Sequence, residues 1–366
     1  MKKYLYFFCF DVSGMKKFFI YLQLIFIGSF YITYNILGVI ILAIIRTVLF
    51  PFPALKNEGT LIIKRKWLDL TSTLVGLYFH KPIYVAYNKE ILKNKRSIII
   101  SNHITNYDWI FLMLVLRELD KYDELRIILK ESLAKIPIFG YGMKCFKFIF
   151  LKRNWSEDKN KLREGIGNLK DKLKYNVLIF PEGTFIDSET HKKSKTFSTT
   201  LSHKINNKTF NPEYTLIPRT RGLGLLYNEL KNRSDGVIDT TLLYTPFYKY
   251  PSEIFTTKEL LEKKLLSTQI FIILDSLKLE SDDEKWIYNQ FHRKNNIIKK
   301  FSENVEEFSK VNTLEHLSYN IYNITDQSYN FKKIELWSNS SYAYISIYIS
   351  FKIILLYGIL AYFNKI

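Results

Sequence analysis

The apolar positions of this chain fall into short runs separated by helical patterns. Several runs are continuous rather than alternating, which is typical of strands covered on both faces of a sheet. The pattern therefore predicts an α/β fold, with a mixed, largely parallel sheet flanked by helices, over roughly residues 60–275. The runs are "SIII" (97–100), "RIIL" (126–129), "FKFIFL" (146–151), "NVLIF" (176–180), "YTLI" (214–217), "TTLLY" (240–244) and "QIFIIL" (269–274).

Two stretches between these runs have the spacing of helices. Leu162, Ile166 and Leu169 recur at helical intervals with charged residues between them, which predicts an amphipathic helix over roughly 157–174. Residues 109–119, "WIFLMLVLREL", are apolar nearly throughout. That composition predicts a mostly buried helix.

The longest apolar stretch predicts a membrane anchor. Residues 18–45 carry no charge over 28 positions, and a membrane span needs about 20 apolar residues. No small-residue cleavage site follows, so we interpret the stretch as an N-terminal membrane anchor rather than a signal peptide. It is either one tilted helix or a re-entrant pair broken near Gly28 or Asn35.

A second stretch, residues 342–363, is apolar apart from Lys352. It predicts a C-terminal hydrophobic helix, which either spans the membrane or lies in its interface. The chain then divides into an anchor (1–50), an α/β domain (51–275), a helical extension (276–340) and a membrane-associated or transmembrane helix (341–366).

The net charge of the chain indicates which kind of molecule it binds. Lys and Arg number 53 and Asp and Glu 35, which leaves a net charge of +18. Such an excess favours anionic partners, among them nucleic acid, membrane phosphates and polyanionic substrates. We do not expect a nucleic-acid binder, because the chain lacks an aromatic stacking platform and carries an anchor. Cys9 and Cys145 lie far apart and indicate neither a disulfide framework nor a zinc site.

Five of the predicted strands end in polar or charged residues. In open α/β sheets, ligands bind outside the carboxyl ends of the strands. We therefore predict a functional site at this edge of the sheet. The residues are Asn102 and His103, Lys130 and Glu131, Lys152 and Arg153, Pro181 to Thr184, and Pro218 and Arg219.

His103 and Asp108 are the candidate acid–base pair. On one continuous helix their spacing would separate them by about 140°. We therefore expect His103 on the loop after the strand and Asp108 in the first turn of the next helix, where its carboxylate would orient the ring. No Ser or Cys lies in a G-x-S-x-G context. The pair thus predicts general-base activation of a substrate hydroxyl, and a chance pairing is the alternative.

The segment "FPEGT", 180–184, predicts a ligand-binding turn. Pro181 ends the strand, Gly183 lets the backbone approach a ligand, and Glu182 suits a substrate hydroxyl or a cation. An ordinary strand-terminating turn is the alternative. Basic residues at neighbouring strand ends suit phosphate binding, with solvated strand ends as the alternative: Lys152, Arg153 and Arg219.

Together, "NHITNYDW", "FPEGT" and "PRTRG", in that order, resemble the glycerolipid acyltransferase family, the 1-acylglycerol-3-phosphate O-acyltransferases. The family motif blocks fall at 102–108, 146–153, 180–184 and 214–222, and the resemblance covers roughly residues 60–300. The flanks, such as "LKESLAKIPIFGYGM", resemble the eukaryotic lysocardiolipin and lysophosphatidylinositol acyltransferase branch. The basic block lacks the Gly that often opens it.

The resemblance implies that His103 of the H-x4-D motif is a general base oriented by Asp108. It implies an acyl-CoA-dependent, membrane-bound enzyme of phospholipid metabolism, acting on lysophosphatidylinositol, lysocardiolipin or lysophosphatidic acid. It implies acyl-CoA as co-substrate with no cofactor or metal, and a catalytic domain on the cytosolic face of the endoplasmic reticulum; protein partners are not indicated. A non-catalytic binder of anionic lipids on a degenerate scaffold is the alternative. The implied substrate-binding residues are Asn102, Lys152, Arg153, Phe180, Pro181, Glu182, Gly183, Thr184, Pro218 and Arg219.

Overall fold

A computed structural model describes residues 12–336, apart from 168, 170–171, 202–203, 206–207, 257, 260–266 and 279–284, together with 346 and 350. The hydrophobic helix predicted at 342–363 therefore lies almost wholly outside the described residues and stays a prediction. The predicted domain boundaries likewise stay predictions.

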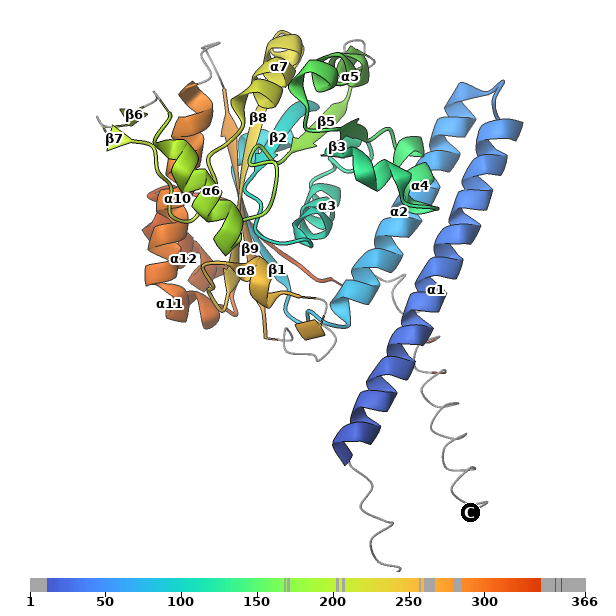
Figure 1. The fold of residues 1–366 in the computed structure, drawn as a ribbon, viewed down its shortest axis with the longest axis horizontal. Helices are drawn as coiled ribbons and strands as arrows, with labels where there is room; N and C mark the ends of the chain where they lie inside the picture. Colours follow the sequence, from blue (N-terminus) through green and yellow to red (C-terminus); the bar gives the residue numbers. More distant parts are fainter. Residues whose placement is uncertain are drawn as a thin grey trace, which may run out of the picture.

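An eight-stranded sheet forms the centre of the molecule, in the order β10-β1-β9-β8-β2-β5-β3-β4 (Figure 1). From β8 to β4 all neighbours are parallel, whereas β8 pairs with β9 and β1 with β10 in antiparallel fashion. The predicted mixed, largely parallel sheet is confirmed. The strands are β1 (Ile83–Tyr87), β2 (Arg96–Ser101), β3 (Leu125–Lys130), β4 (Ile149–Leu151), β5 (Tyr175–Ile179), β8 (Gly236–Thr245), β9 (Gln269–Leu277) and β10 (Asn330–Ile334).

Helices cover both faces of this sheet (Figure 1). In β2, Ile99 packs into the layer that contains α3, while Ile98 and Ile100 pack into the layer of α5 and α7. Both faces are buried, which is why the run is continuously apolar. The helices are α1 (Val12–Val48), α2 (Pro53–Gly76), α3 (Asp108–Glu118), α4 (Phe139–Cys145), α5 (Trp155–Gly167), α6 (Ser188–Ser198), α7 (Thr220–Leu230), α8 (Pro251–Ile254), α10 (Lys285–Glu303), α11 (Val305–Ser309) and α12 (Leu314–Thr325). Short 3₁₀ turns, η2 (Lys89–Leu92) and η3 (Glu131–Lys135), and a two-stranded sheet, β6 (Lys204–Ile205) and β7 (Lys208–Thr209), complete the described elements.

The strand predicted at 214–217 is wrong. Its backbone N–H groups donate to side chains rather than to a neighbouring strand: that of Leu216 to Glu182 Oε2 (2.8 Å) and that of Ile217 to Ser194 Oγ (2.9 Å). The run is apolar because it packs into the core, where Leu216 and Ile217 are buried. An extended apolar segment thus satisfies its donors without joining the sheet.

The strand predicted at 146–151 shortens to β4, because α4 ends at Cys145 and a turn through Lys147, at φ 61°, precedes the strand. The predicted helices at 109–119 and 157–174 correspond to α3 and α5. β1 and β10, which the apolar runs did not indicate, extend the sheet on its other side.

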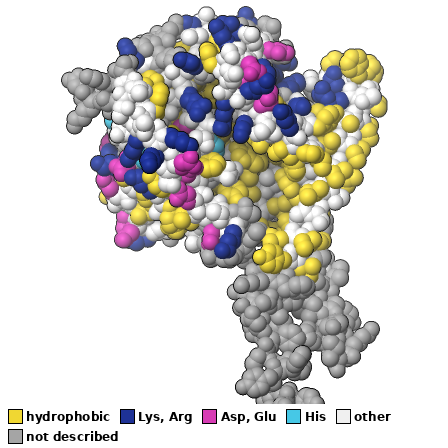
Figure 2. Space-filling model, viewed as in Figure 1, with side chains coloured by type: hydrophobic (Ala, Val, Ile, Leu, Met, Phe, Trp, Pro, Cys, Tyr) yellow, Lys and Arg dark blue, Asp and Glu magenta, His cyan; other side chains and the backbone are white. Residues whose placement is uncertain are grey.

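α1 and α2 form a helical hairpin beside the sheet, and hydrophobic side chains run along it (Figure 2). Within α1, the segment Leu24–Val48 is long and apolar enough to cross a membrane, by length and composition. α1 continues without a break past Gly28 and Asn35, so the re-entrant alternative is wrong. Lys64 ties the hairpin to the body, because its Nζ donates to three backbone carbonyls around β3, at 2.9–3.0 Å.

Candidate active site

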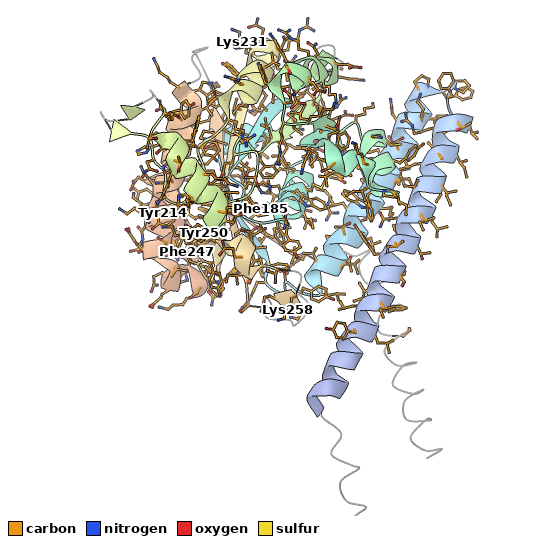
Figure 3. All side chains as sticks on the ribbon, in the orientation of Figure 1. Phe185, Tyr214, Lys231, Phe247, Tyr250 and Lys258 are labelled. Atoms are coloured by element: carbon orange, nitrogen blue, oxygen red, sulfur yellow. The ribbon has the colours of Figure 1, made fainter. Side chains whose placement is uncertain are left out.

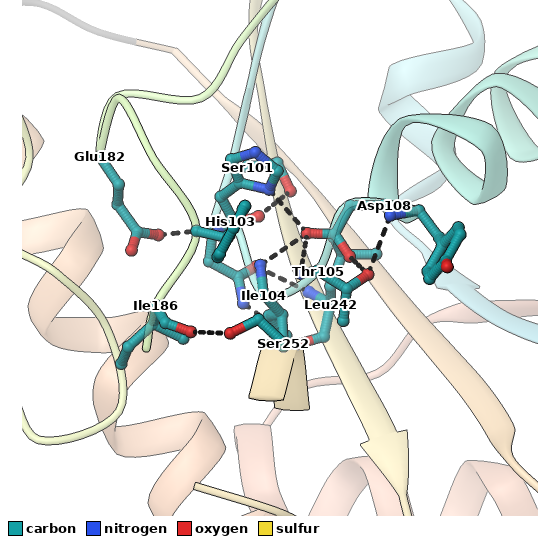
Figure 4. Close-up of polar contacts among 12 residues, drawn as sticks. Ser101, His103, Ile104, Thr105, Asp108, Glu182, Ile186, Leu242 and Ser252 are labelled. Atoms are coloured by element: carbon teal, nitrogen blue, oxygen red, sulfur yellow. Dashed lines mark hydrogen bonds and ion pairs between the residues drawn. The ribbon is translucent and has the colours of Figure 1, made fainter. Parts of the chain in front are cut away.

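The loops after β2 and β5 meet at the carboxyl edge of the sheet, because the two strands are parallel neighbours. The backbone of His103 joins them: its N–H donates to Glu182 Oε1 (2.9 Å), and its C=O accepts from the N–H of Ile186 (3.0 Å). Figure 4 shows these loops side by side. The structure therefore brings the 102–108 and 180–184 segments together, as the strand ends predicted.

His103 and Asp108 form a hydrogen-bonded pair, with 2.9 Å between Nδ1 and Oδ2. Asp108 is the first residue of α3, and His103 lies on the loop that follows β2. The intervening turn folds the chain back, which closes the gap that a continuous helix would leave. The pair can therefore act as one unit.

The Asp108 carboxylate is held in one orientation by five hydrogen bonds. Its side chain is 0% exposed. Besides His103, Oδ2 accepts the backbone N–H groups of Ile104 (2.6 Å) and Thr105 (3.0 Å), and Oδ1 accepts the hydroxyls of Thr105 (2.7 Å) and Tyr244 (2.8 Å). Five donors compensate the loss of water around a buried carboxylate. Tyr244, on β8, was missing from the sequence prediction, because nothing near it in sequence marks it.

The His103 ring lies between two aromatic side chains. It stacks on Phe180, with ring centroids 4.3 Å apart, and meets the edge of Phe185 at 5.8 Å. In the view of Figure 3, Phe185 is labelled between α6 and α3. The side chain is 18% exposed. Nδ1 is occupied by Asp108, and Nε2 has no hydrogen bond to any residue that the structure describes. When Nδ1 carries the proton, Nε2 is therefore free to accept one from a substrate.

Two of the predicted substrate-binding side chains are occupied by backbone groups. The Asn102 amide accepts from the N–H of Leu242 (2.8 Å) and donates to its C=O (3.2 Å), which extends the β2–β8 ladder by one step. The Glu182 carboxylate accepts one N–H on each oxygen, from His103 and from Leu216. Both residues thus position the loops of the site, and both side chains are buried.

Burial raises the pKa of Glu182 to about 8, and the backbone donors of Leu216 and His103 oppose that rise. In an unfolded chain a Glu titrates near pH 4.3. Because the folded pKa is the higher one, this group stabilises the fold fully at low pH. That contribution is lost as the pH rises through about 8.

We expect the free energy of unfolding of the wild type, relative to Glu182→Gln, to decrease between about pH 5 and pH 8. Gln keeps one acceptor oxygen and carries no charge, so the difference between the two proteins isolates the titration of Glu182. Urea unfolding of both proteins across this range measures it. A difference that stays constant with pH would show that Glu182 titrates normally.

Arg219 and Arg153 supply positive charge beside the turn after β5. Gly183 has φ 75°, and a Cβ there would lie 3.2 Å from Arg219 Nε, so glycine lets the guanidinium lie against the turn. The Arg219 N–H also donates to the C=O of Pro181 (2.8 Å). Partial loss of solvent around Arg153, which remains exposed, lowers its pKa, and the positive charge of Arg219 lowers it further, so the two guanidinium groups lie within electrostatic reach of each other.

Lys152 is directed elsewhere. Its Nζ pairs with Glu157 in the first turn of α5, and its N–H donates to Asp158 (2.7 Å). Thr184 is half-buried and Pro218 buried near the same turn. Among the described residues, no group of three His, Cys, Asp or Glu is placed to hold a metal ion.

The comparisons with known proteins agree with this geometry. The model of the acyltransferase family matches residues 83–218, which include both the His–Asp pair and the 180–184 turn. Residues 83–218 are a domain of the acyltransferase family. The resemblance read from the motifs is thereby confirmed.

The proteins similar to this acyltransferase domain include lysocardiolipin and lysophosphatidylinositol acyltransferases, the branch that the flanking sequences indicated. Lysocardiolipin acyltransferase 1 of Gallus gallus is 32% identical over 223 residues, which cover 60% of this chain and 56% of that protein. The 2-acyl-1-lysophosphatidylinositol acyltransferase of Saccharomyces cerevisiae is 27% identical over 259 residues, covering 58% and 64%. The matched region thus spans less than two thirds of the length of each of these two relatives. A solved 1-acyl-sn-glycerophosphate acyltransferase of Thermotoga maritima has a TM-score of 0.37 at 15% identity, covering 77% of this chain and 99% of that one.

Proposed function

We propose that the protein is a membrane-bound, acyl-CoA-dependent acyltransferase that acylates the free glycerol hydroxyl of a lysophospholipid. The observation that carries the proposal is the buried, fully hydrogen-bonded Asp108 holding His103 with Nε2 unoccupied. Relatives named for lysocardiolipin and lysophosphatidylinositol supply the class of acceptor. Lysophosphatidylinositol, lysocardiolipin and lysophosphatidic acid are the candidate acceptors.

In the proposed reaction, the oxygen of the acceptor hydroxyl attacks the carbonyl carbon of the acyl-CoA thioester. At the same time Nε2 of His103 takes the proton of that hydroxyl. Asp108, 2.9 Å from Nδ1, stabilises the imidazolium that forms. The C–S bond of the tetrahedral intermediate then breaks, and the leaving thiolate takes the proton from the imidazolium. Ester and thiol are formed in equal amounts, and His103 returns to its starting state.

The acceptor's phosphate would bind beside the same turn. Arg153 and Arg219 offer two guanidinium groups within electrostatic reach of each other, and a guanidinium binds phosphate oxygens in pairs. Lys152 is neutralised by Glu157, so we assign the phosphate to Arg153 and Arg219. Their side chains are exposed, as a site for an incoming lipid head group requires.

The helical hairpin would hold this site at a bilayer. Leu24–Val48 has the length and composition of a span, and both proposed substrates carry acyl chains. We expect the catalytic domain to face the cytosol, because acyl-CoA is available there and Lys and Arg residues favour the cytosolic side of a membrane. The expected membrane is the endoplasmic reticulum. A glycan on Asn232, in the exposed turn after α7, would contradict that orientation.

The test is a panel of lysophospholipids and acyl-CoAs presented to the full-length protein in detergent or vesicles. We expect phospholipid and free thiol to appear in equal amounts with at least one acceptor. Binding of lysophospholipid without consumption of any acyl-CoA would instead support the non-catalytic alternative.

Arg219→Gln should raise the KM for the lysophospholipid by about tenfold or more, because a charge-assisted bond to phosphate contributes about 1.5–3 kcal/mol. The turnover number should change less, since the proposed role of Arg219 is to bind the phosphate and not to transfer the proton. Arg221→Gln, two residues further on and also exposed, is the matched control. Steady-state kinetics with an acceptor that lacks phosphate should show no difference between the two variants, and equal effects of both on the lysophospholipid KM would refute the assignment.

A further inference from the structure

A second basic site lies away from the His–Asp pair, in a groove beside the edge strand β4. The groove has a volume of about 780 Å³ and runs between η3 and α4 on one side and α5 on the other. Lys and Arg side chains gather over α4 and α5, next to the hydrophobic hairpin (Figure 2). We refer to it as the basic groove.

The groove is lined by six cationic side chains and two carboxylates. Lys161 and Glu131 form an ion pair with each other, so they contribute no net charge. The remaining residues are five cations and one carboxylate: Arg126, Lys135, Lys144, Lys147, Lys172 and Glu164. The groove therefore carries a net positive charge, which makes it attractive to an anion.

Arg126 is the decisive residue. It is 5% exposed and lines the groove, yet it forms no ion pair or side-chain hydrogen bond with any described residue. Burial lowers the pKa of its guanidinium, and Glu124, whose charge opposes that effect, forms no ion pair with it. An unpaired buried charge is destabilising. A ligand with anionic oxygens would supply the missing partners.

Lys147 points to the same conclusion by its conformation. It has φ 61°, in the left-handed region, directly after α4, where glycine is the usual residue. Lys147 is exposed, but partial loss of solvent lowers its pKa, and the charges of Arg126 and Lys172 lower it further. The chain thus has a lysine, rather than a glycine, in a left-handed conformation beside two other cations.

The basic groove is separate from the proposed active site. In the sheet, Arg126 of β3 is the register partner of Val177 of β5, and Val177 is in turn the partner of Ile98 of β2. Ile98 lies five residues before His103, which places Arg126 about 16 Å before His103 along the strand direction. The groove is also lined by apolar groups, Phe148 and Ile149 among them, and His103 is not among its lining residues.

We propose that the basic groove binds phosphate groups, with Arg126 and Lys147 as direct ligands. The phosphates have two possible sources. One is the nucleotide end of CoA, which carries phosphate groups. The other is the head group of an anionic phospholipid beside the helical hairpin. The CoA source rests on the proposed acyl donor, whereas the phosphate site itself does not.

The variants are chosen so that loss of binding is separate from loss of folding. Lys147→Gly removes the charge and relieves the positive φ, so its stability should be unchanged or higher. Arg126→Gln removes an unpaired buried charge and should also fold. Lys299→Ala, an exposed lysine on α10, is the matched control.

Full-length protein in detergent is titrated with CoA and 3′-dephospho-CoA by calorimetry. It is also mixed with phosphatidylcholine vesicles, with and without phosphatidic acid, in a flotation assay. Each groove variant should weaken binding of one of these probes about tenfold, with Lys299→Ala unchanged. If the variants lose binding of CoA only, the groove binds the phosphates of the acyl donor. If they lose binding of the phosphatidic acid vesicles only, the groove binds a lipid head group.

If both groove variants bind all probes as the wild type does, the proposal is overturned. His103→Ala separates this proposal from the proposed function, because it should abolish transfer while leaving binding in the basic groove intact. A protein that binds phosphate through the groove but never transfers an acyl group would refute the function alone.

Discussion

His103→Ala is expected to reduce the turnover number for acyl transfer by about a thousandfold, since a general base contributes about 10²–10⁴ to the rate. The fold should survive, because the backbone groups of His103 make its contacts with Glu182 and Ile186. Thiol release and phospholipid formation, measured together, report the loss. Lysophospholipid affinity should change little.

His80→Ala is the matched control, because His80 is an exposed histidine in the turn before β1. It should retain wild-type activity. If His103→Ala transferred acyl groups at a rate near that of the wild type, His103 would not be the base, and a water or another group would have to take the proton.

The sequence predicted the centre of the site because its signal is local. His103 and Asp108 lie on one loop and one helix start, so their spacing alone restricts how they can meet. The continuous run at 97–100 likewise predicted β2, because a strand covered on both faces needs apolar residues at consecutive positions.

Other features depend on contacts between distant parts of the chain, and sequence patterns could not show them. Tyr244 reaches Asp108 across 136 positions. Glu182 was expected to face a substrate, but its oxygens accept from Leu216 and His103. A glutamate between Pro181 and Gly183 looks the same in the sequence whether it binds a substrate or accepts backbone N–H groups. Which of the two occurs depends on how the 214–217 segment packs against it.

The clustering of cations in the basic groove could not be predicted from the sequence either. Arg126, Lys147 and Lys172 come from β3, from the turn before β4 and from the chain after α5. In the sequence they are scattered lysines and arginines in a chain of +18 net charge. Folding brings them to one edge of the sheet, and burial of Arg126 without a partner is what distinguishes them from solvated surface charge.

Asp108→Asn should separate orientation of the His103 ring from charge. An Asn side chain can place its oxygen where Oδ2 lies and its NH₂ group where Oδ1 lies. The oxygen then still accepts from His103 Nδ1 and from the N–H of Ile104. The NH₂ group faces the hydroxyls of Thr105 and Tyr244, which can rotate to accept its hydrogens. The fold and the ring orientation should therefore be preserved.

What Asp108→Asn removes is the negative charge 2.9 Å from Nδ1, so the imidazolium formed in the reaction loses its counter-charge. We expect the turnover number to fall about a hundredfold with the KM for lysophospholipid nearly unchanged. Asp108→Ala, by contrast, leaves several buried donors without acceptors, at about 1–3 kcal/mol each, and should lower the melting temperature as well. Kinetics and thermal unfolding of both variants measure the two effects, and wild-type turnover in Asp108→Asn would mean that Asp108 only orients the ring.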